Sequence, residues 1–457
     1  MPRIDTMPHD TQLPQLQVVT DAEIMKDVFQ EKLPGFSENE LRIDRLKLIQ
    51  FSYHPGKSCT IGYLLKVKDL SAAKEGNQIF FAVMRPGADI ESRYADALHQ
   101  GLVEPEFGPP IYALPELDMI LWGFPNDAKM KQLPHILNPE SFAELAVANW
   151  ARLGLPPEIM LKNVFSEVVK YVPQMRCTIR HTLTLSTGEK LTLYSKTFIT
   201  KNFAERTYLT MHELWKATVE HKEELFIPEP VFYQKETNTM FMRSVGGRNA
   251  DAELGNIDLN AAAARIGRGL ARVHDCNIEG LPALSDHVIV AKLAQAEELL
   301  SNSDDAFKTR VEAIVEKLLK QYPILTPVEN VPIHGGFRIS QLLLVDGDFA
   351  LIDFDDFLMG NPLTDIASFA AHLLYLPLKN HLAMDESYEA IRHFSRAYDQ
   401  QSNRALPADQ LAWHIAAQLV GKQAKKCVRL GKKNYHQMVN QLLGMAEDVI
   451  SGRMTLI

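Results

Sequence analysis

The amino-acid sequence predicts an α+β fold in which small, mainly antiparallel sheets precede a helical C-terminal part. Apolar runs separated by polar turns occupy the first half of the chain, and helical spacing of apolar residues begins near Asn260. A nine-residue motif also occurs twice, at an offset of 118 residues. With 457 residues, 46% of them hydrophobic and 23% charged, the chain is long enough for two or three units with sizeable cores.

Composition limits the classes of function. The formal net charge of -9 disfavours a general nucleic-acid binder, because such proteins carry a basic surface. The four cysteines lie far apart without paired metal-ligand spacing, which indicates reduced thiols. Neither a signal-peptide core nor a run of about 18 apolar residues is present. We therefore expect a cytoplasmic protein with no nucleic-acid and no membrane partner.

The first elements follow a proline-containing segment. Residues 1–20 are predicted to be a loose arm, with order beginning near Asp21. Residues 46–67 have the pattern of a strand, a turn and a second strand, and residues 78–84 form another apolar run after a polar loop. These segments predict the first sheet.

A second stretch repeats the first. Residues 53–61 and 171–179 share Tyr, Pro, Cys, Thr and Ile in register, which is five identities in nine positions. The parallel continues downstream, where residues 80–84 correspond to residues 193–197 and a helical segment follows each. Two similar hairpins arising by chance are the alternative, but duplication of a small sheet-plus-helix unit explains more of the pattern.

Helices are expected from residue 260 onward. Ala263, Ile266, Leu270 and His274 share one helical face, and Gly280-Leu-Pro282 ends this segment. Further helices are predicted around residues 288–300, 306–322 and 387–450. The basic residues Lys422, Lys425, Lys426, Arg429, Lys432 and Lys433 form one predicted helix face, either a solvated surface or a site for an anionic ligand.

Polar residues flank a predicted hairpin on both sides in the sequence. The apolar runs 342–345 and 349–352 are separated by Asp346-Gly347-Asp348, and an Asp-Gly pair between such runs is typical of a hairpin turn. Residues 334–341 precede the first strand and residues 353–356 follow the second. Both polar segments should therefore meet at one end of the ribbon and form a shared site.

This stretch resembles the catalytic and metal loops of the aminoglycoside phosphotransferase and choline kinase family. His334-Gly335 resembles the start of the family's His-Gly-Asp loop, Ile352-Asp353-Phe354 its Ile-Asp-Phe element, and Gly360-Asn-Pro362 with Asp365-Ile-Ala367 its third element. The resemblance covers about residues 160–380. It implies a protein-kinase-like bilobal fold, with a small, mainly antiparallel sheet lobe and a helical C-lobe. The internal repeat adds an extra N-terminal copy of the small lobe to this expectation.

Two positions depart from the family pattern. Gly336 stands where the family has its catalytic Asp, which orients the attacking hydroxyl and accepts its proton, and Gln341 stands where a metal-binding Asn is usual. Asp353 corresponds to the family's magnesium carboxylate. Asp355 and Asp356 are candidates for a substitute base or second-metal ligands.

Other residues near this loop have simpler interpretations beside the functional ones. The resemblance implies that His334 holds the loop by hydrogen bonds. Arg338 is either a solvated charge or a ligand of substrate or phosphate anions. Asp365 is also a candidate cap for the helix that begins near Ile366.

The nucleotide-binding residues are likewise implied by the resemblance. Lys196, in an apolar strand, resembles the lysine that contacts nucleotide phosphates, with Glu205 as its expected partner and Glu213 as the rival. The alternative is a lysine that points to solvent. The loop ending at Arg176 should cover the phosphates but lacks a glycine. Residues Met242 and Ser244 resemble the adenine hinge. In the first repeat, Val83 stands where the lysine would be.

The predicted domains are the arm at 1–20, an accessory domain resembling a duplicated kinase N-lobe at 21–145, the kinase-like N-lobe at 146–247 and the helical C-lobe at 248–457. The main hypothesis is a protein that binds ATP and Mg²⁺ with impaired or absent phosphotransfer. An active ATP-dependent kinase of a sugar, amino alcohol or aminoglycoside-like compound is the second. A structural or interaction module without nucleotide binding is the third. The N-terminal domain is the candidate surface for a protein partner. Residues 370–450 should form the acceptor pocket.

Overall fold

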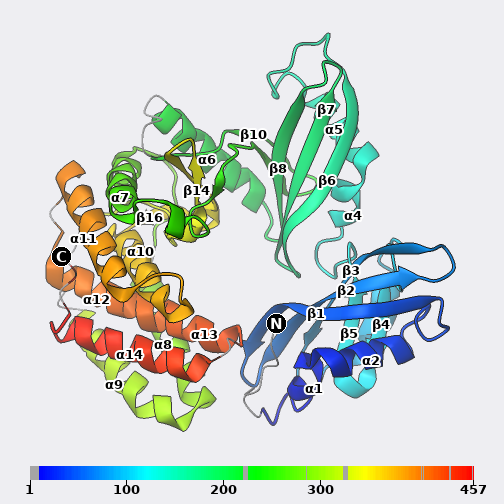
Figure 1. The fold of residues 1–457 in the computed structure, drawn as a ribbon, viewed down its shortest axis with the longest axis horizontal. Coiled ribbons are helices and arrows are strands. Elements are labelled where there is room, and N and C mark those ends of the chain that lie inside the picture. Colours follow the sequence, from blue (N-terminus) through cyan, green and yellow to red (C-terminus); the bar gives the residue numbers. More distant parts are fainter. Residues whose placement is uncertain are drawn as a thin grey trace. The chain divides into compact units, whose positions relative to one another are not determined.

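The computed structural model describes residues 10–219, 225–284, 286–322, 328–402, 404, 406–431, 434–454 and 456. They form two compact units. One extends to Ala204 and includes Phe232–Phe241 and Val428–Lys433; the other contains Glu205–Val231, Met242–Cys427 and the segment from Asn434 onward. Two antiparallel sheets dominate the first unit and helices dominate the second (Figure 1). The predicted α+β fold class is confirmed.

The first sheet has five strands in the order β1-β2-β3-β5-β4, and helices α1 to α3 belong to the same segment. Helix α2 packs along β1, and Asp21 begins this helix by accepting hydrogen bonds from the backbone N–H groups of Glu23 and Ile24. The elements are α1 (Leu16–Thr20), α2 (Ala22–Lys32), β1 (Leu41–His54), β2 (Ser58–Asp69), β3 (Lys74–Met84), α3 (Ile90–Leu98), β4 (Ile111–Leu114) and β5 (Met119–Gly123).

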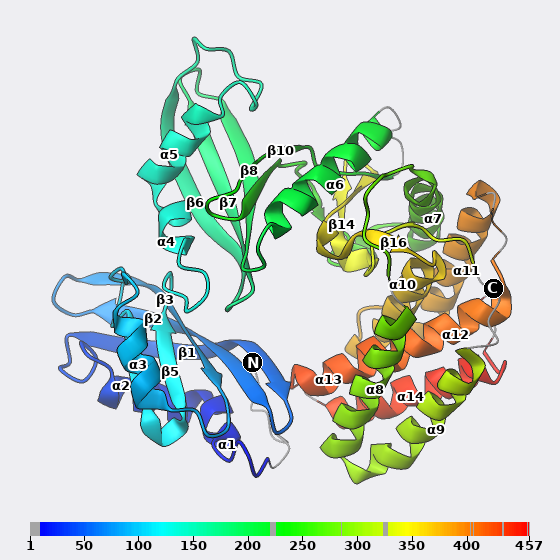
Figure 2. The same cartoon turned by 180° about the vertical axis from the view of Figure 1, so that it is seen from behind.

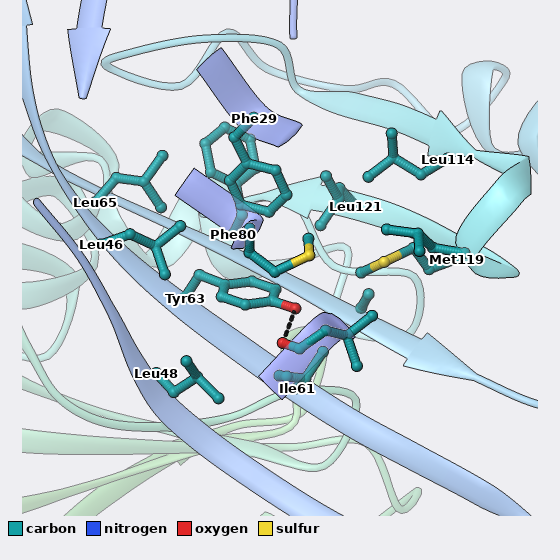
Figure 3. Close-up of a cluster of buried hydrophobic side chains, with 14 of the residues drawn as sticks. Phe29, Leu46, Leu48, Ile61, Tyr63, Leu65, Phe80, Leu114, Met119 and Leu121 are labelled. Carbon is teal, nitrogen blue, oxygen red and sulfur yellow. Dashed lines mark hydrogen bonds between the residues drawn. The ribbon is translucent and has the colours of Figure 1, made fainter. Parts of the chain in front are cut away.

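Apolar side chains from these helices and strands form one buried core (Figure 3). Alternate residues of β2 face it, because successive side chains of a strand point to opposite faces. Phe29 of α2 meets Tyr63 of β2 edge to face, with ring centroids 5.1 Å apart. The buried hydroxyl of Tyr63 donates to the carbonyl oxygen of Val19 at 2.7 Å. Helices α1 and α2 are therefore part of this sheet's core.

The second sheet has the order β10-β11-β8-β7-β6, which matches the first strand for strand. Two short helices again precede it and a helix again follows its third strand. The elements are α4 (Leu133–Leu137), α5 (Pro139–Ala148), β6 (Leu161–Val172), β7 (Arg176–Leu185), β8 (Lys190–Phe198), α6 (Phe203–Thr218), β10 (Pro230–Gln234) and β11 (Thr239–Arg243). The extra N-terminal copy of the small sheet lobe is thus present as a matching fold.

The residue pairing between neighbouring strands supports the correspondence between the two sheets that the repeated motif predicts. Val83 of β3 lies opposite Thr60, and Lys196 of β8 lies opposite Thr178. Each threonine follows the cysteine of the repeated motif. The first sheet therefore carries a valine at the place of the candidate nucleotide lysine.

A carboxylate holds the turn between the first two strands of the second sheet. Oδ2 of Asp127 accepts from the hydroxyl of Tyr171 at 2.6 Å and from the N–H of Gln174 at 2.8 Å. Its Oδ1 accepts from the N–H groups of Lys129 and Met130 at 2.7 and 2.9 Å. This aspartate joins the segment after β5 to the turn between β6 and β7.

The first sheet has the same contact. Oδ2 of Asp10 accepts from the hydroxyl of Tyr53 and from the N–H of Gly56, both at 2.8 Å. Its Oδ1 accepts from the N–H of Gln12 at 2.8 Å. We call the Asp10–Tyr53–Gly56 and Asp127–Tyr171–Gln174 groups the two turn clamps.

Two predicted boundaries need correction. The arm predicted for residues 1–20 is wrong for its second half, because Leu13, Leu16 and Val19 are buried in the first core. The first nine residues lie outside the described part of the chain. The boundary predicted at residue 145 falls inside α5, although α4 and α5 pack on the second sheet, where Phe142 stacks on His181. Helices α4 and α5 therefore belong with the second sheet.

The second unit is built on helices and two small sheets (Figure 2). The predicted face of α7, including Ala263, Ile266, Leu270 and His274, is buried. The helices of the C-terminal part are α7 (Leu259–Asp275), α8 (Asp286–Ser303), α9 (Asp305–Gln321), α10 (Leu363–Tyr375), α11 (Met384–Gln401), α12 (Ala408–Gln418), a π-helix (Leu419–Ala424), α13 (Lys425–Arg429) and α14 (Tyr435–Ile450).

The predicted hairpin is confirmed in this unit. Its turn residues Asp346 and Gly347 have positive φ angles of 49° and 90°, which suit an Asp-Gly turn. The four-stranded sheet has the order β12-β14-β15-β9, and β13 pairs with β16. The strands are β9 (Leu225–Phe226), β12 (Arg248–Asn249), β13 (Val331–Ile333), β14 (Leu342–Val345), β15 (Asp348–Leu351) and β16 (Leu358–Gly360).

Candidate functional site

The loop after β13 is held by a buried carboxylate. Asp365 lies in the first turn of α10; its Oδ2 accepts from the N–H of His334 at 2.6 Å and its Oδ1 from the N–H of Phe337 at 3.5 Å. Nε2 of His274 lies 3.3 Å from the same Oδ2. Burial alone would raise the pKa of Asp365, but the hydrogen bond and charge of His274 hold this pKa below its usual value. Asp365 therefore orders the loop and does not cap its own helix.

His334 connects this loop to the end of the hairpin. Its Nε2 lies 3.0 Å from the carbonyl oxygen of Ile352, and its ring meets Phe354 edge to face. Burial lowers the pKa of His334, so the neutral ring donates from Nε2 to that carbonyl. Nδ1 is buried without a hydrogen-bond partner in the described part of the chain. The contacts of His334 are those of a residue that fixes the loop.

The two predicted polar segments meet, as the hairpin predicts. The N–H of Ile352 donates to the carbonyl oxygen of Gln341 at 2.9 Å, and Nε2 of Gln341 donates to Oδ2 of Asp353 at 3.4 Å. Asp353 has φ 76° and ψ 59°, a left-handed conformation that is uncommon for residues other than glycine. Such strain gathers at functional sites.

The side-chain amide oxygen of Gln341 is available as a ligand. Gln341 is 7% exposed, and its Oε1 is buried without a hydrogen-bond partner among the described residues. Nε2 of Gln341 faces the Asp353 carboxylate, and turning the amide over would set Oε1 beside it. Such a pair of oxygens suits Mg²⁺, which also takes oxygens from phosphate and water. These two residues therefore fit a magnesium ion.

The two glycines of the loop differ in what they allow. Gly335 has φ +75°, and a β-carbon there would lie 2.4 Å from the carbonyl oxygen of Asp356, so this position requires glycine. A β-carbon at Gly336 would lie 3.6 Å from Nζ of Lys422 and 4.0 Å from Nε2 of Gln341, which are ordinary contacts. The backbone therefore does not require glycine at residue 336.

Sequence reasoning placed Lys422 on a basic helix face and missed its contact with the loop. Nζ of Lys422 donates to Oγ of the buried Ser368 at 3.0 Å, and burial together with the charge of Arg338 lowers the pKa of Lys422 to about 8. A π-helix carries this residue, and no sequence signal predicts such an insertion. The predicted face residues Lys432 and Lys433 lie outside the described residues.

The remaining loop candidates lie close by. A single 3₁₀ turn, Phe354–Asp356, carries Asp355, which is buried, and Asp356, which is exposed. Nε of Arg338 donates to Oγ of Ser340 at 3.0 Å, so its guanidinium is partly engaged within its own loop. The structure thus gathers Arg338, Asp355 and Asp356 around the His334–Gly336 loop.

The nucleotide-binding candidates are divided between the units. Lys196 is buried in β8, with Nζ 5.7 Å from the ring centroid of Phe198, and Arg176 begins β7 in the same unit. Glu205, in the first turn of α6, belongs to the second unit, as do Met242 and Ser244. The pairing of Lys196 with Glu205, and their position relative to Gln341 and Asp353, stay predictions.

Two of these candidates have further local contacts. Oγ of Ser244 accepts from the N–H of Gly246 at 3.2 Å, so the candidate hinge is a turn that ends in glycines. The rival Glu213 is exposed on α6 and contacts Lys216 at 3.2 Å. Glu213 therefore already has a cation on its own helix.

Comparison with known proteins supports the resemblance inferred from the motifs. Residues 198–407 match the sequence model of the phosphotransferase enzyme family. No curated protein sequence matches the chain. No helix among the described residues is long and apolar enough to cross a membrane.

Solved structures with a similar fold include three enzymes or enzyme-family proteins. A choline/ethanolamine kinase family protein from Mesorhizobium loti is 14% identical, with 62% of this chain and 88% of that chain covered and a TM-score of 0.44. The macrolide 2'-phosphotransferase MphH from Brachybacterium faecium is 14% identical (66% and 98% covered; TM-score 0.43). A thermostable mutant of aminoglycoside phosphotransferase APH(4)-Ia, in complex with ADP and hygromycin B, is 11% identical (68% and 98%; 0.44).

Proposed function

We propose, from the match of residues 198–407 to the phosphotransferase enzyme family, that this chain binds ATP with Mg²⁺ and that its phosphotransfer is impaired or absent. One observation carries the second half of the proposal. At residue 336, where the family resemblance calls for a carboxylate, there is only a glycine, and the neighbouring groups are the ammonium of Lys422 and the amide nitrogen of Gln341. Both neighbours donate hydrogen bonds and neither replaces the missing acceptor.

The metal half of the proposal rests on Asp353 and Gln341. Among the described residues no cluster of three or more His, Cys, Asp or Glu side chains is arranged to hold a metal by itself. Mg²⁺ in phosphotransfer sites is usually held by one or two carboxylates together with phosphate oxygens, so one carboxylate and one amide oxygen agree with that pattern. When bound, the ion would neutralise charge on the phosphate oxygens.

Loss of the carboxylate should affect transfer more than binding. Phosphoryl transfer depends mainly on positioning and on electrostatic stabilisation, and the carboxylate positions the attacking hydroxyl. A base in general acid–base catalysis contributes about 10²- to 10⁴-fold. Nucleotide contacts from other residues would remain, so binding without efficient transfer is the expected outcome.

Asp356 supports a second candidate function, an active kinase of a small-molecule hydroxyl. Its β-carbon lies 3.1 Å from the point where a β-carbon at Gly335 would stand, so its exposed side chain begins beside the loop. In this alternative the acceptor oxygen bonds to the γ-phosphorus, the bond from that phosphorus to the ADP oxygen breaks, and the hydroxyl proton passes to Asp356. Asp355 is buried and less suited to this role.

Thermal unfolding with ATP and Mg²⁺ tests the binding proposal. Wild type should be stabilised by about 2.7 kcal/mol when ATP is at about 100 times its Kd. Asp353→Ala should lose the part of the shift that needs Mg²⁺, whereas Asp409→Ala, at an exposed aspartate of α12, should keep it. Absence of any shift at millimolar ATP would contradict both nucleotide-binding functions.

Turnover separates the two candidate functions. Labelled ATP would be incubated with sugars, amino alcohols and aminoglycosides, and phosphorylated product measured. Binding without product supports impaired transfer. Product that disappears in Asp356→Ala, while the ATP-induced thermal shift persists, supports the active kinase.

We also infer that the first sheet unit is a duplicated copy that has lost its nucleotide contact. The identical strand order, the two turn clamps and the replacement of lysine by Val83 support this. Photolabelling with an azido-ATP should then modify peptides from β8 and not from β3. Equal labelling of both would contradict the inference.

A further inference from the structure

Lys422, in the π-helix Leu419–Ala424, lies beside Gly336 of the loop after β13. Its Nζ points to the backbone of Gly336, 3.6 Å from the place of an absent β-carbon, and donates to Oγ of Ser368. An ammonium has three N–H donors. In the described part of the chain Ser368 is its one hydrogen-bond partner, and no carboxylate lies within salt-bridge distance of it.

Charged groups of both signs act on Lys422. The charges of Arg338 and of Lys292 on α8 disfavour protonation of Lys422, while Asp365 and Asp356 favour it. Asp365 is already committed to the N–H groups of the loop and to His274. The nearby His372 is buried on α10, where burial and the charges of Arg338, Lys426, Lys379 and Lys422 keep its pKa well below its usual value. Several cations therefore act on Lys422 at this end of the loop.

The π-helix is the backbone feature that carries Lys422. π-Helices are rare and occur frequently at functional sites. This one packs against α8, α12 and α14. The next lysines along the chain have other contacts, since Nζ of Lys425 donates to Oε1 of Gln295 at 2.8 Å and Nζ of Lys426 lies 5.8 Å from the ring centroid of Tyr375.

We propose that Lys422, with Arg338 and Ser368, binds a phosphate group beside Gly336, in the space where a catalytic carboxylate would otherwise stand. The ammonium, guanidinium and hydroxyl supply several donors, which a tetrahedral oxyanion can accept together. An aspartate at residue 336 would repel such a group, whereas glycine leaves room for it. The phosphate belongs either to a phosphorylated small molecule or to the end of a nucleotide.

Isothermal titration with inorganic phosphate at low ionic strength tests the site without any nucleotide. Lys422→Gln should weaken phosphate binding at least about tenfold, in line with the loss of one charge-assisted contact. Lys422→Arg should retain most of it. Lys425→Gln changes the same charge three residues away and should bind like wild type.

Labelling of the unmodified protein gives a second measurement that needs no variant. Phosphate should slow acetylation of Lys422 relative to Lys425, as followed by mass spectrometry. No phosphate binding by wild type, equal losses in the Lys422→Gln and Lys425→Gln variants, or unchanged acetylation of Lys422 would overturn the proposal.

Competition distinguishes the two sources of the phosphate. Loss of phosphate binding with ATP but not with ADP would identify the nucleotide's terminal phosphate as the occupant. Phosphate binding that persists with both would indicate a separate phosphorylated ligand. Either result supports the site, and neither depends on phosphotransfer. If ATP fails to bind while phosphate still does, the proposed nucleotide function fails and this inference stands.

Discussion

The hydroxyl of Tyr171 donates a hydrogen bond of 2.6 Å to Oδ2 of Asp127, and this pair has a counterpart in the first sheet. Each clamp joins a strand-connecting turn to the segment that precedes the two helices of its own sheet. The clamps therefore tie helices, turn and sheet into one structural unit, and their removal should affect stability before it affects any chemistry.

Asp127→Ala should destabilise the protein. The substitution removes the acceptor for Tyr171 and for three backbone N–H groups, and unsatisfied donors of this kind cost about 1–3 kcal/mol each when they are buried away from water. Because part of the clamp is reached by water, we expect a total loss of about 2–4 kcal/mol. Tyr171→Phe should cost about 1 kcal/mol.

Urea unfolding followed by circular dichroism would measure both losses. Asp96→Ala, at an exposed aspartate of α3, is the matched control and should leave the midpoint unchanged. An Asp127→Ala midpoint equal to that of the control would show that the clamp adds nothing to stability.

Stability should fall in acid partly because of His181. Its Nδ1 and Nε2 each lie 2.8 Å from a serine hydroxyl, of Ser166 and Ser195, and burial lowers its pKa from 6.5 to about 3. Between these values the unfolded chain binds a proton that the folded chain does not. The free energy of unfolding therefore decreases as pH falls from 6.5 towards 3, by at most about 1.4 kcal/mol per pH unit from this residue.

His181→Gln keeps polar contacts to both serines and has no such titration. We expect its unfolding free energy, measured by denaturant titration at several pH values, to depend less on pH between 4 and 6.5 than that of wild type. His135→Gln, at an exposed histidine of α4, should follow wild type. Parallel pH profiles for wild type and His181→Gln would contradict the assignment.

Lys422→Met should abolish phosphate binding without lowering the free energy of unfolding. Replacing a partly buried ammonium without a carboxylate partner by an apolar side chain is often neutral or stabilising, and we expect a gain of about 0–1 kcal/mol in the free energy of unfolding. Phosphate binding should be lost in the same variant. A loss of more than about 2 kcal/mol would indicate that Lys422 is retained for the fold and not for a ligand.

Gly336→Asp should restore little phosphotransfer by itself. A β-carbon fits at residue 336, but the new carboxylate would pair with Lys422 and be held away from an acceptor. We expect less than about a tenfold rise in ATP turnover, and a rise of about 10²-fold or more when Lys422→Gln is added. Adding Asp353→Ala should remove the gain. Equal gains from the single and double variants would show that Lys422 does not restrain the carboxylate.

Local patterns predicted much of this fold. The Asp346-Gly347 pair located the hairpin, and the spacing around Ile266 and Leu270 located α7, because turn geometry and helical periodicity are encoded by neighbouring residues. The repeated motif at Tyr53 and Tyr171 predicted the matching sheets. Helices α1 and α4 were missed because each is a single short turn, too brief for periodicity to indicate it.

The candidate site was predictable in part. The meeting of Gln341 with Asp353 followed from the hairpin, since both residues flank the same ribbon end. The role of Lys422 beside Gly336 was not predictable, because it depends on a π-helix and on a contact across many intervening residues. A signal for the clamps was present, since Asp10 and Asp127 each lie two residues after a proline.

The freedom of residue 336 to carry a side chain has an evolutionary consequence. Glycine and aspartate codons can differ by a single base, so sterics alone would leave a carboxylate at residue 336 one mutation away. The lysine opposite restricts that route, because the new carboxylate would be paired with its ammonium. Under the proposed function, an effective base at residue 336 would therefore require a second change at residue 422, because the first change alone would gain little.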